Sequence, residues 1–171
     1  MAYGILFLRV VVGSIFFAHG AQKLFGWWGG GGLRGTAGWL GSTGFRPPFL
    51  MAVLVALSES SGALLVVGVA TPFVALALAA TMVVAVGTAH WKNGFWSGKG
   101  GYEFNLVLWS AAVAIAAIGP GRFSIDRLLG WDDNISGLWW GIAVFALSLA
   151  GGLLILASRQ KPAPAEAAGE Q

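Results

Sequence analysis

The sequence predicts an all-α integral membrane bundle, and three observations support this fold class. Of the 171 residues, 57% are hydrophobic and only 10% are charged, and the mean hydropathy is +0.76, so polar surface is too scarce to cover a soluble globule. Five apolar stretches each approach the length of a membrane-spanning helix. The connection between the second and third stretches is very short, which makes these two helices antiparallel neighbours.

The expected helices cover residues 4–25, 48–70, 72–91, 102–119 and 138–157. Pro47 and Pro48 suit the start of the second helix. The fourth helix is expected to begin near Tyr102, because its strictly apolar part would span only about 21 Å of a bilayer core of roughly 30 Å. Residues 1–158 therefore form the predicted membrane domain. Residues 159–171, rich in Ala and Pro, are expected to form a disordered cytoplasmic tail.

The basic residues predict the orientation in the membrane. One face of the expected topology carries Lys23, Arg34, Arg46, Lys92, Lys99, Arg159 and Lys161. The other face has Arg122 and Arg127, apart from Arg9 inside the first helix. By the positive-inside rule the N-terminus lies outside and the C-terminus lies in the cytoplasm. Because the basic residues are scattered singly, the expected partner is the lipid bilayer and not nucleic acid.

The first helix carries unusual polar residues along one narrow face, made of Arg9, Gly13, Phe16, Gly20 and Lys23 with His19 beside it. A cation without a partner in lipid costs on the order of 3 kcal/mol, so Arg9 should be paired. Glu59 is the only acidic residue within a later apolar stretch, and small residues on its side of the helix permit close packing. We therefore predict an Arg9–Glu59 ion pair. The pair either fixes the helix register or leaves Glu59 as a proton-transfer group.

Other polar residues gather near the cytoplasmic ends of the first, third and fourth helices in this topology. They are His19, Gln22, Lys23, His90, Lys92, Glu103 and Asn105. The histidines either bond water and carbonyl groups at the interface or take part in binding. In the fifth helix, residues 137–141 (GLWWG) match a G-x-x-x-G pattern, which indicates packing on the bundle or on another copy in a homo-oligomer.

Several motifs resemble the DoxX family. They are Arg9, residues 17–26 (FAHGAQKLFG), residues 35–38 (GTAG), residues 44–45 (GF), Pro47 with Pro48, Glu59, His90 with residues 93–95 (NGF), and residues 100–106 (GGYEFNL). The resemblance covers roughly residues 4–130 and implies a four-helix core in a bacterial or archaeal cytoplasmic membrane. The fifth helix is an addition to that core. The resemblance also implies a link to quinone-coupled thiosulfate oxidation and to membrane complexes that handle oxidative and thiol stress.

Two functions follow as hypotheses from the residues and the resemblance together. In the first, the chain is the membrane subunit of a quinone-linked redox system. Its head-group ligands are His19, Gln22, Lys23, His90 and Asn105, and its proton-transfer groups are Glu59 and Glu103. In the second, the chain is a non-catalytic anchor that docks soluble redox or sulfur-handling enzymes on its basic cytoplasmic face. A transporter is less favoured, because no paired inverted repeat or broken-helix pattern is evident.

The expected cofactor is a quinone. Haem is not expected, since the chain has no attachment cysteine and the sequence defines no ring pocket, and no metal-ligand spacing is visible. The sequence contains no cysteine, which rules out disulfides and thiol redox chemistry performed by this chain itself. Any thiol must therefore come from a partner.

Overall fold

The computed structural model describes residues 2–160, and this part of the chain is helical and contains no strand. The main helices are α1 (Ala2–Phe25), α2 (Gly32–Ser42), α3 (Pro48–Ser60), α4 (Gly62–Val67), α5 (Thr71–Ala85), α6 (Glu103–Ile118), α7 (Ile125–Leu128) and α8 (Leu138–Ala157). The short turns are η1 (Trp27–Gly29), η2 (Val86–His90), η3 (Trp91–Asn93) and η4 (Ser97–Lys99). Residues 161–171, most of the expected tail, lie outside the described residues.

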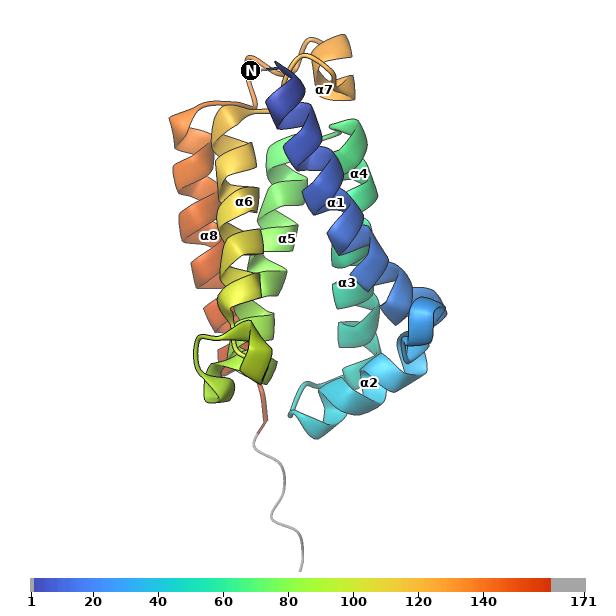
Figure 1. Ribbon diagram of the computed structural model, residues 1–171. Helices are drawn as coiled ribbons and strands as arrows, with labels where there is room; N and C mark the ends of the chain where they lie inside the picture. The colour runs from blue at the N-terminus through green and yellow to red at the C-terminus, as the bar shows by residue number, and fades with distance from the viewer. Residues whose placement is uncertain (1, 161–171) are drawn as a thin grey trace, which may run out of the picture.

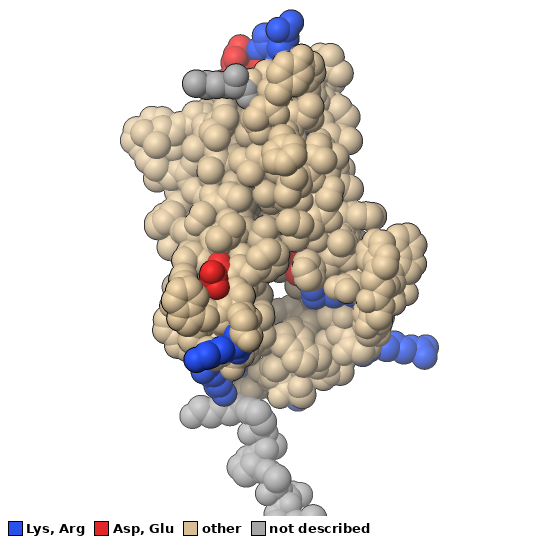
Figure 2. All heavy atoms as spheres, in the orientation of Figure 1, with Lys and Arg blue, Asp and Glu red and all other residues tan. Residues whose placement is uncertain are grey.

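Four helical segments are long and apolar enough to cross a membrane, and the all-α membrane bundle is thereby confirmed. Within residues 2–160 they are Ala2–Phe25, Pro48–Val67, Thr71–Asn93 and Leu138–Ala157. Helix α6 is apolar too, but its 16 residues make it shorter. Figure 2 shows Lys, Arg, Asp and Glu toward the two ends of the molecule, with a broad uncharged band between them, as contact with lipid requires.

Helix α5 lies between two groups of helices (Figure 1). It packs against α6 and α8 on one side and against α3 and α4 on the other, and α1 crosses α3 and α4. The start of α1 lies beside α7, whereas α8 ends at the opposite end of the bundle together with α2. We call these the α7 end and the α2 end.

The buried face of α1 is the one that the sequence predicts. Arg9, Gly13, Phe16 and Gly20 are all buried there. A Cβ atom at Gly13 would lie 2.8 Å from the Val66 side chain, and one at Gly20 would lie 2.8 Å from the Ser60 Cα atom. Two glycines therefore let α1 approach α3 and α4 closely, and they set the register of the crossing.

The span expected over residues 48–70 is broken at Ser61 into α3 and α4. The Ser61 hydroxyl donates to the Ser58 carbonyl oxygen at 2.6 Å, a local bond that competes with regular helix hydrogen bonding. Helix α4 ends at Gly68, whose φ of 71° is a left-handed conformation that glycine adopts readily. The last carbonyl groups of α4 are consequently available to other donors.

The predicted Arg9–Glu59 ion pair is wrong. The Arg9 side chain is 1% exposed, and its guanidinium donates to four backbone carbonyl oxygens, those of Leu65 (3.1 Å), Val66 (3.0 Å), Phe123 (2.7 Å) and Pro120. These carbonyls lie at the C-terminal end of α4 and in the loop after α6. The carbonyl oxygens and the negative end of the α4 dipole compensate the cation in place of the Glu59 carboxylate.

The register of α1 explains why Glu59 is out of reach of Arg9. Gly20 lies against Ser60, which places Glu59 level with the last turns of α1. Arg9 lies about 16 Å further along the helix at 1.5 Å per residue. Lys23 is near enough to Glu59 and forms the ion pair instead.

Asp126 is a buried acidic residue that no sequence pattern indicated. Its carboxylate accepts hydrogen bonds from the Ala70 amide (2.7 Å), the Thr71 amide (2.9 Å) and the Thr71 hydroxyl (2.7 Å). Ala70 has a left-handed φ of 49°, which costs on the order of 1 kcal/mol in a residue other than glycine. Asp126 thus fixes the strained α4–α5 turn, and its charge also interacts favourably with Arg9.

Helix α8 packs on the bundle through small residues. Gly141 lies against Ala117 of α6, and Gly152 lies against Val83 of α5. The Trp109 indole donates to the Ser148 hydroxyl at 3.0 Å. The G-x-x-x-G pattern was expected to pack either on the bundle or on another copy of the chain. At Gly141 the structure shows packing on the bundle, against α6.

Candidate functional site

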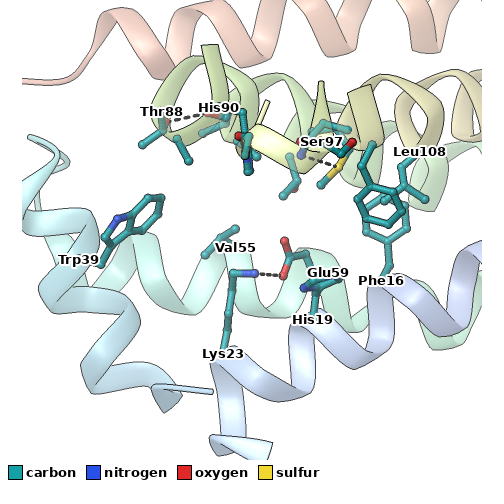
Figure 3. Close-up of a pocket in the computed structure, with 18 of the residues that line it drawn as sticks. Phe16, His19, Lys23, Trp39, Val55, Glu59, Thr88, His90, Ser97 and Leu108 are labelled. Carbon is teal, nitrogen blue, oxygen red and sulfur yellow. Dashed lines mark hydrogen bonds and ion pairs between the residues drawn. The ribbon is translucent and has the colours of Figure 1, made fainter. Parts of the chain in front are cut away.

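A cavity of about 440 Å³ opens at the α2 end. Helices α1, α2 and α3 form one side, and α5, η2 and α6 form the other, as the close-up in Figure 3 shows. The space-filling view in Figure 2 shows the hollow in the lower half of the molecule, with charged side chains at its wall. Both the volume and the largely apolar lining fall within the range of small-molecule sites.

The first polar wall of the cavity is the Lys23–Glu59 ion pair. The Glu59 side chain is 5% exposed and the Lys23 side chain 26%, so the carboxylate is the more deeply buried partner. Lys23 lies in the last turn of α1, where the helix dipole favours a cation. Because the two charges cancel, this wall offers hydrogen-bonding atoms without a net charge.

The facing wall carries His90, the last residue of the π-helical turn η2. Its Nδ1 atom lies 2.8 Å from the Gly100 carbonyl oxygen. A carbonyl oxygen only accepts, so Nδ1 carries the hydrogen and donates it. In the neutral ring Nε2 is then an acceptor, ready for a donor in the cavity or for a proton.

Asn105, on α6, lines the same wall and lacks a strong hydrogen-bond partner. Asn105 is 7% exposed, and its Nδ2 atom donates to the Met82 sulfur at 3.5 Å. A thioether is a weak acceptor, whereas buried amide groups are normally bonded to strong ones. The Asn105 amide therefore retains hydrogen-bonding capacity toward the cavity.

Of the seven residues predicted for the quinone site, the structure brings together five and separates two. Glu59, Lys23, His19, His90 and Asn105 line one cavity although they lie far apart in sequence. Gln22 and Glu103 are not among the lining residues. Within residues 2–160, no three His, Asp or Glu side chains gather as a metal site would require.

Gln22 and Glu103 instead hold neighbouring loops. The Gln22 amide lies 3.5 Å from the Trp28 carbonyl oxygen, in the turn after α1. The Glu103 carboxylate accepts from the Ser97 amide at 2.9 Å and from the Ser97 hydroxyl at 3.1 Å. Glu103 thereby fixes the loop before α6, and through Ser97 it shapes the rim of the cavity without facing into it.

Helix α2, which forms one wall of the cavity, was not predicted from the sequence. Trp39 and Leu40 of this helix line the cavity, and Figure 3 shows Trp39 across the cavity from Thr88 and His90. Residues 26–35 contain six glycines, which disfavour a helix, so no helix was expected between residues 25 and 48. The Trp39-Leu40 pair, followed by a buried Phe45, was the signal that this segment returns to the bundle.

Comparison with known proteins identifies the family of this chain. The DoxX family model matches residues 4–91, which include Lys23, Glu59 and His90. The protein named "Putative oxidoreductase CatD" of Bacillus subtilis (strain 168) is 33% identical over 123 residues, covering 72% of this chain and 84% of that protein. No solved structure shows a significant match. The chain therefore belongs to the DoxX family.

Proposed function

We propose that this protein is the membrane subunit of a quinone-linked redox system, and that the cavity at the α2 end binds the quinone head group. The observation that carries the proposal is the pair of facing polar walls, Lys23–Glu59 on one side and His90 with Asn105 on the other. A mostly apolar cavity with a few convergent polar groups is the usual form of a small-molecule site. The name of the Bacillus subtilis relative, "Putative oxidoreductase CatD", supports a redox role.

The residues of the cavity fit a neutral ring that carries two carbonyl groups. Lys23 and Asn105 both have N–H groups that can donate to carbonyl oxygens. Lys23 is already paired with Glu59, so the cavity offers little to a ligand with a net charge. The π-helical turn that presents His90 is a further indication, because such turns occur frequently at functional sites.

The chain contributes position and protons to the chemistry. A bound quinone supplies the exchange of two electrons and two protons. Lys23 and Asn105 would hold its carbonyl oxygens, while Glu59 and the Nε2 atom of His90 would give or take protons there. The open side of the cavity connects these groups with water at the α2 end. Electrons come from a partner protein or a small reductant, since the chain has no thiol of its own.

We further propose that the α2 end faces the cytoplasm of a bacterial cell, with the N-terminus outside. Arg34, Arg46, Lys92 and Lys99 are exposed at this end, as the positive-inside rule requires of a cytoplasmic face. The same basic surface favours a second candidate function, a non-catalytic anchor for soluble redox or sulfur-handling enzymes that present acidic surfaces.

Quinone binding separates the two functions. Purified protein in mild detergent is extracted with organic solvent to detect retained quinone, and is then titrated with a short-chain quinone. Asn105→Leu should weaken binding by about tenfold, the effect of losing one well-placed hydrogen bond. Asn134→Leu, a matched change at the exposed α7 end, should not alter binding.

A failure to bind quinone would favour the second function, the non-catalytic anchor. The redox proposal is overturned if the wild-type protein neither retains quinone nor binds added quinone. If the same preparation captures soluble enzymes through Arg34 and Lys99, the basic face and not the cavity carries the function.

A further inference from the structure

A second cavity lies on the other side of Asn105. It has a volume of about 430 Å³, runs between α5, α6 and α8, and is lined almost entirely by apolar groups. Leu149, Leu153 and Leu156 form the α8 side, opposite Val83 and Trp109. Leu153 is 59% exposed, so this tail groove, as we name it, reaches the apolar surface of the bundle.

The cavity at the α2 end and the tail groove share two lining residues, Met82 and Asn105. The Asn105 amide donates to the Met82 sulfur at 3.5 Å, so these two residues are in contact where the cavities meet. Methionine has three rotatable side-chain bonds and adapts its shape at little cost. Where the two cavities meet, a weak hydrogen bond and a flexible side chain therefore separate them, and a ligand can displace this contact.

We propose that the tail groove holds the polyisoprenoid tail of a quinone whose head lies in the cavity at the α2 end, and that the Met82–Asn105 contact opens to let the tail pass. The proposal rests on the function proposed above and specifies its ligand as a long-tailed quinone. Asn105 then bonds the head group at the junction, which supplies a stronger acceptor than the Met82 sulfur.

The charges at the junction favour a quinone over a phospholipid. A phosphate group would need a free cation, but Lys23, the lysine of the cavity, is paired with Glu59. An amide such as Asn105 is suited to a neutral carbonyl oxygen. Helix α8 supplies one side of the groove and so completes the proposed binding site.

Two matched variants of α8 test the groove. Leu153 lines it and is 59% exposed, while the adjacent Leu154 is 71% exposed and does not line it. Leu153→Trp fills the groove and Leu154→Trp points elsewhere, and neither crowds the core. Binding is measured by calorimetry in detergent micelles, with a ring-only quinone and with the same ring carrying an isoprenoid tail. Since the tail also dissolves in the micelle, variants are compared with wild type for one ligand at a time.

The tailed quinone should bind Leu153→Trp about tenfold more weakly than wild type, in line with the cost of filling a packed space. Leu154→Trp should bind it as wild type does, and the ring-only quinone should bind all three proteins equally. A quinone with a photoreactive group at the tail end should label α8 between residues 149 and 156.

Other outcomes overturn the inference in distinguishable ways. If ring-only and tailed quinones both bind and Leu153→Trp behaves as Leu154→Trp, the tail does not use the groove, while the proposed function stands. If Leu153→Trp loses only retained phospholipid, the groove is a lipid site and the inference is wrong. If no quinone binds the wild-type protein, the proposed function itself fails.

Discussion

The Lys23 ammonium group of α1 forms an ion pair with the Glu59 carboxylate of α3, and this pair makes one wall of the cavity at the α2 end. Two helices are thereby joined at the level where the proposed chemistry takes place. A buried ion pair adds little net stability but specifies how helices meet. The same two side chains thus serve the fold and the proposed proton transfer.

Removing one partner of this pair should be more harmful than removing both. Lys23→Met leaves a nearly buried carboxylate without compensation and should lower the free energy of unfolding by about 3 kcal/mol. Lys23→Met with Glu59→Gln should restore part of that loss. Denaturation of the single and double variants in detergent micelles measures the coupling. Purely additive losses would mean that the two residues do not interact.

Arg9 should be irreplaceable even by lysine. A lysine has three donors on a single nitrogen and cannot reach carbonyls on both α4 and the loop after α6. Arg9→Lys should therefore lower the free energy of unfolding by about 2 kcal/mol or more, because buried carbonyls lose their partners. Arg34→Lys, at an exposed position, is the control and should melt as wild type does. Equal melting temperatures for both variants would contradict the role assigned to Arg9.

The α1–α3 contact should tolerate no side chain at Gly20. A Cβ atom there would lie 2.8 Å from the Ser60 Cα atom, so Gly20→Ala must push the helices apart. We expect a loss of about 1–3 kcal/mol from overpacking and weaker quinone binding through displacement of Glu59. Gly38→Ala in α2 meets no atom within 4 Å and should be neutral or slightly stabilising. A neutral Gly20→Ala would show that α1 and α3 pack less closely.

The orientation of the bundle is directly measurable, because the sequence contains no cysteine to interfere with labelling. Single cysteines are placed at Asp133, whose side chain is 91% exposed at the α7 end, and at Lys99 at the α2 end. A membrane-impermeant maleimide should label Asp133→Cys in intact cells and Lys99→Cys only after permeabilisation. The reverse pattern would place the cavity on the outer side.

The sequence was sufficient for the class of fold and for the buried face of α1. Hydropathy and helical periodicity depend on local residue types, so Arg9, Gly13 and Gly20 could be placed on one face from the sequence alone. Charge distribution along the expected topology likewise placed His19 and His90 near one end of the bundle. These inferences need only the length and order of the helices.

The partners of the charged residues could not be predicted in the same way. Pairing of Glu59 with Lys23 depends on the register in which Gly20 meets Ser60, which is a property of tertiary packing. Arg9 binds backbone carbonyls, and a carbonyl acceptor has no signature in the sequence. Asp126 could not be identified because it lies in the short helix α7, outside the expected membrane helices, where the sequence gives no sign of burial.

The central claim, that the cavity binds a quinone head group, is tested most directly by photolabelling with a quinone that carries an azide on its ring. The labelled protein is digested and the modified residues are identified by mass spectrometry, with and without excess unlabelled quinone. Labels should fall on residues around Lys23, His90 and Asn105, and excess quinone should suppress them. Labels confined to lipid-facing residues such as Ile142 and Leu154, and unaffected by competition, would contradict the claim.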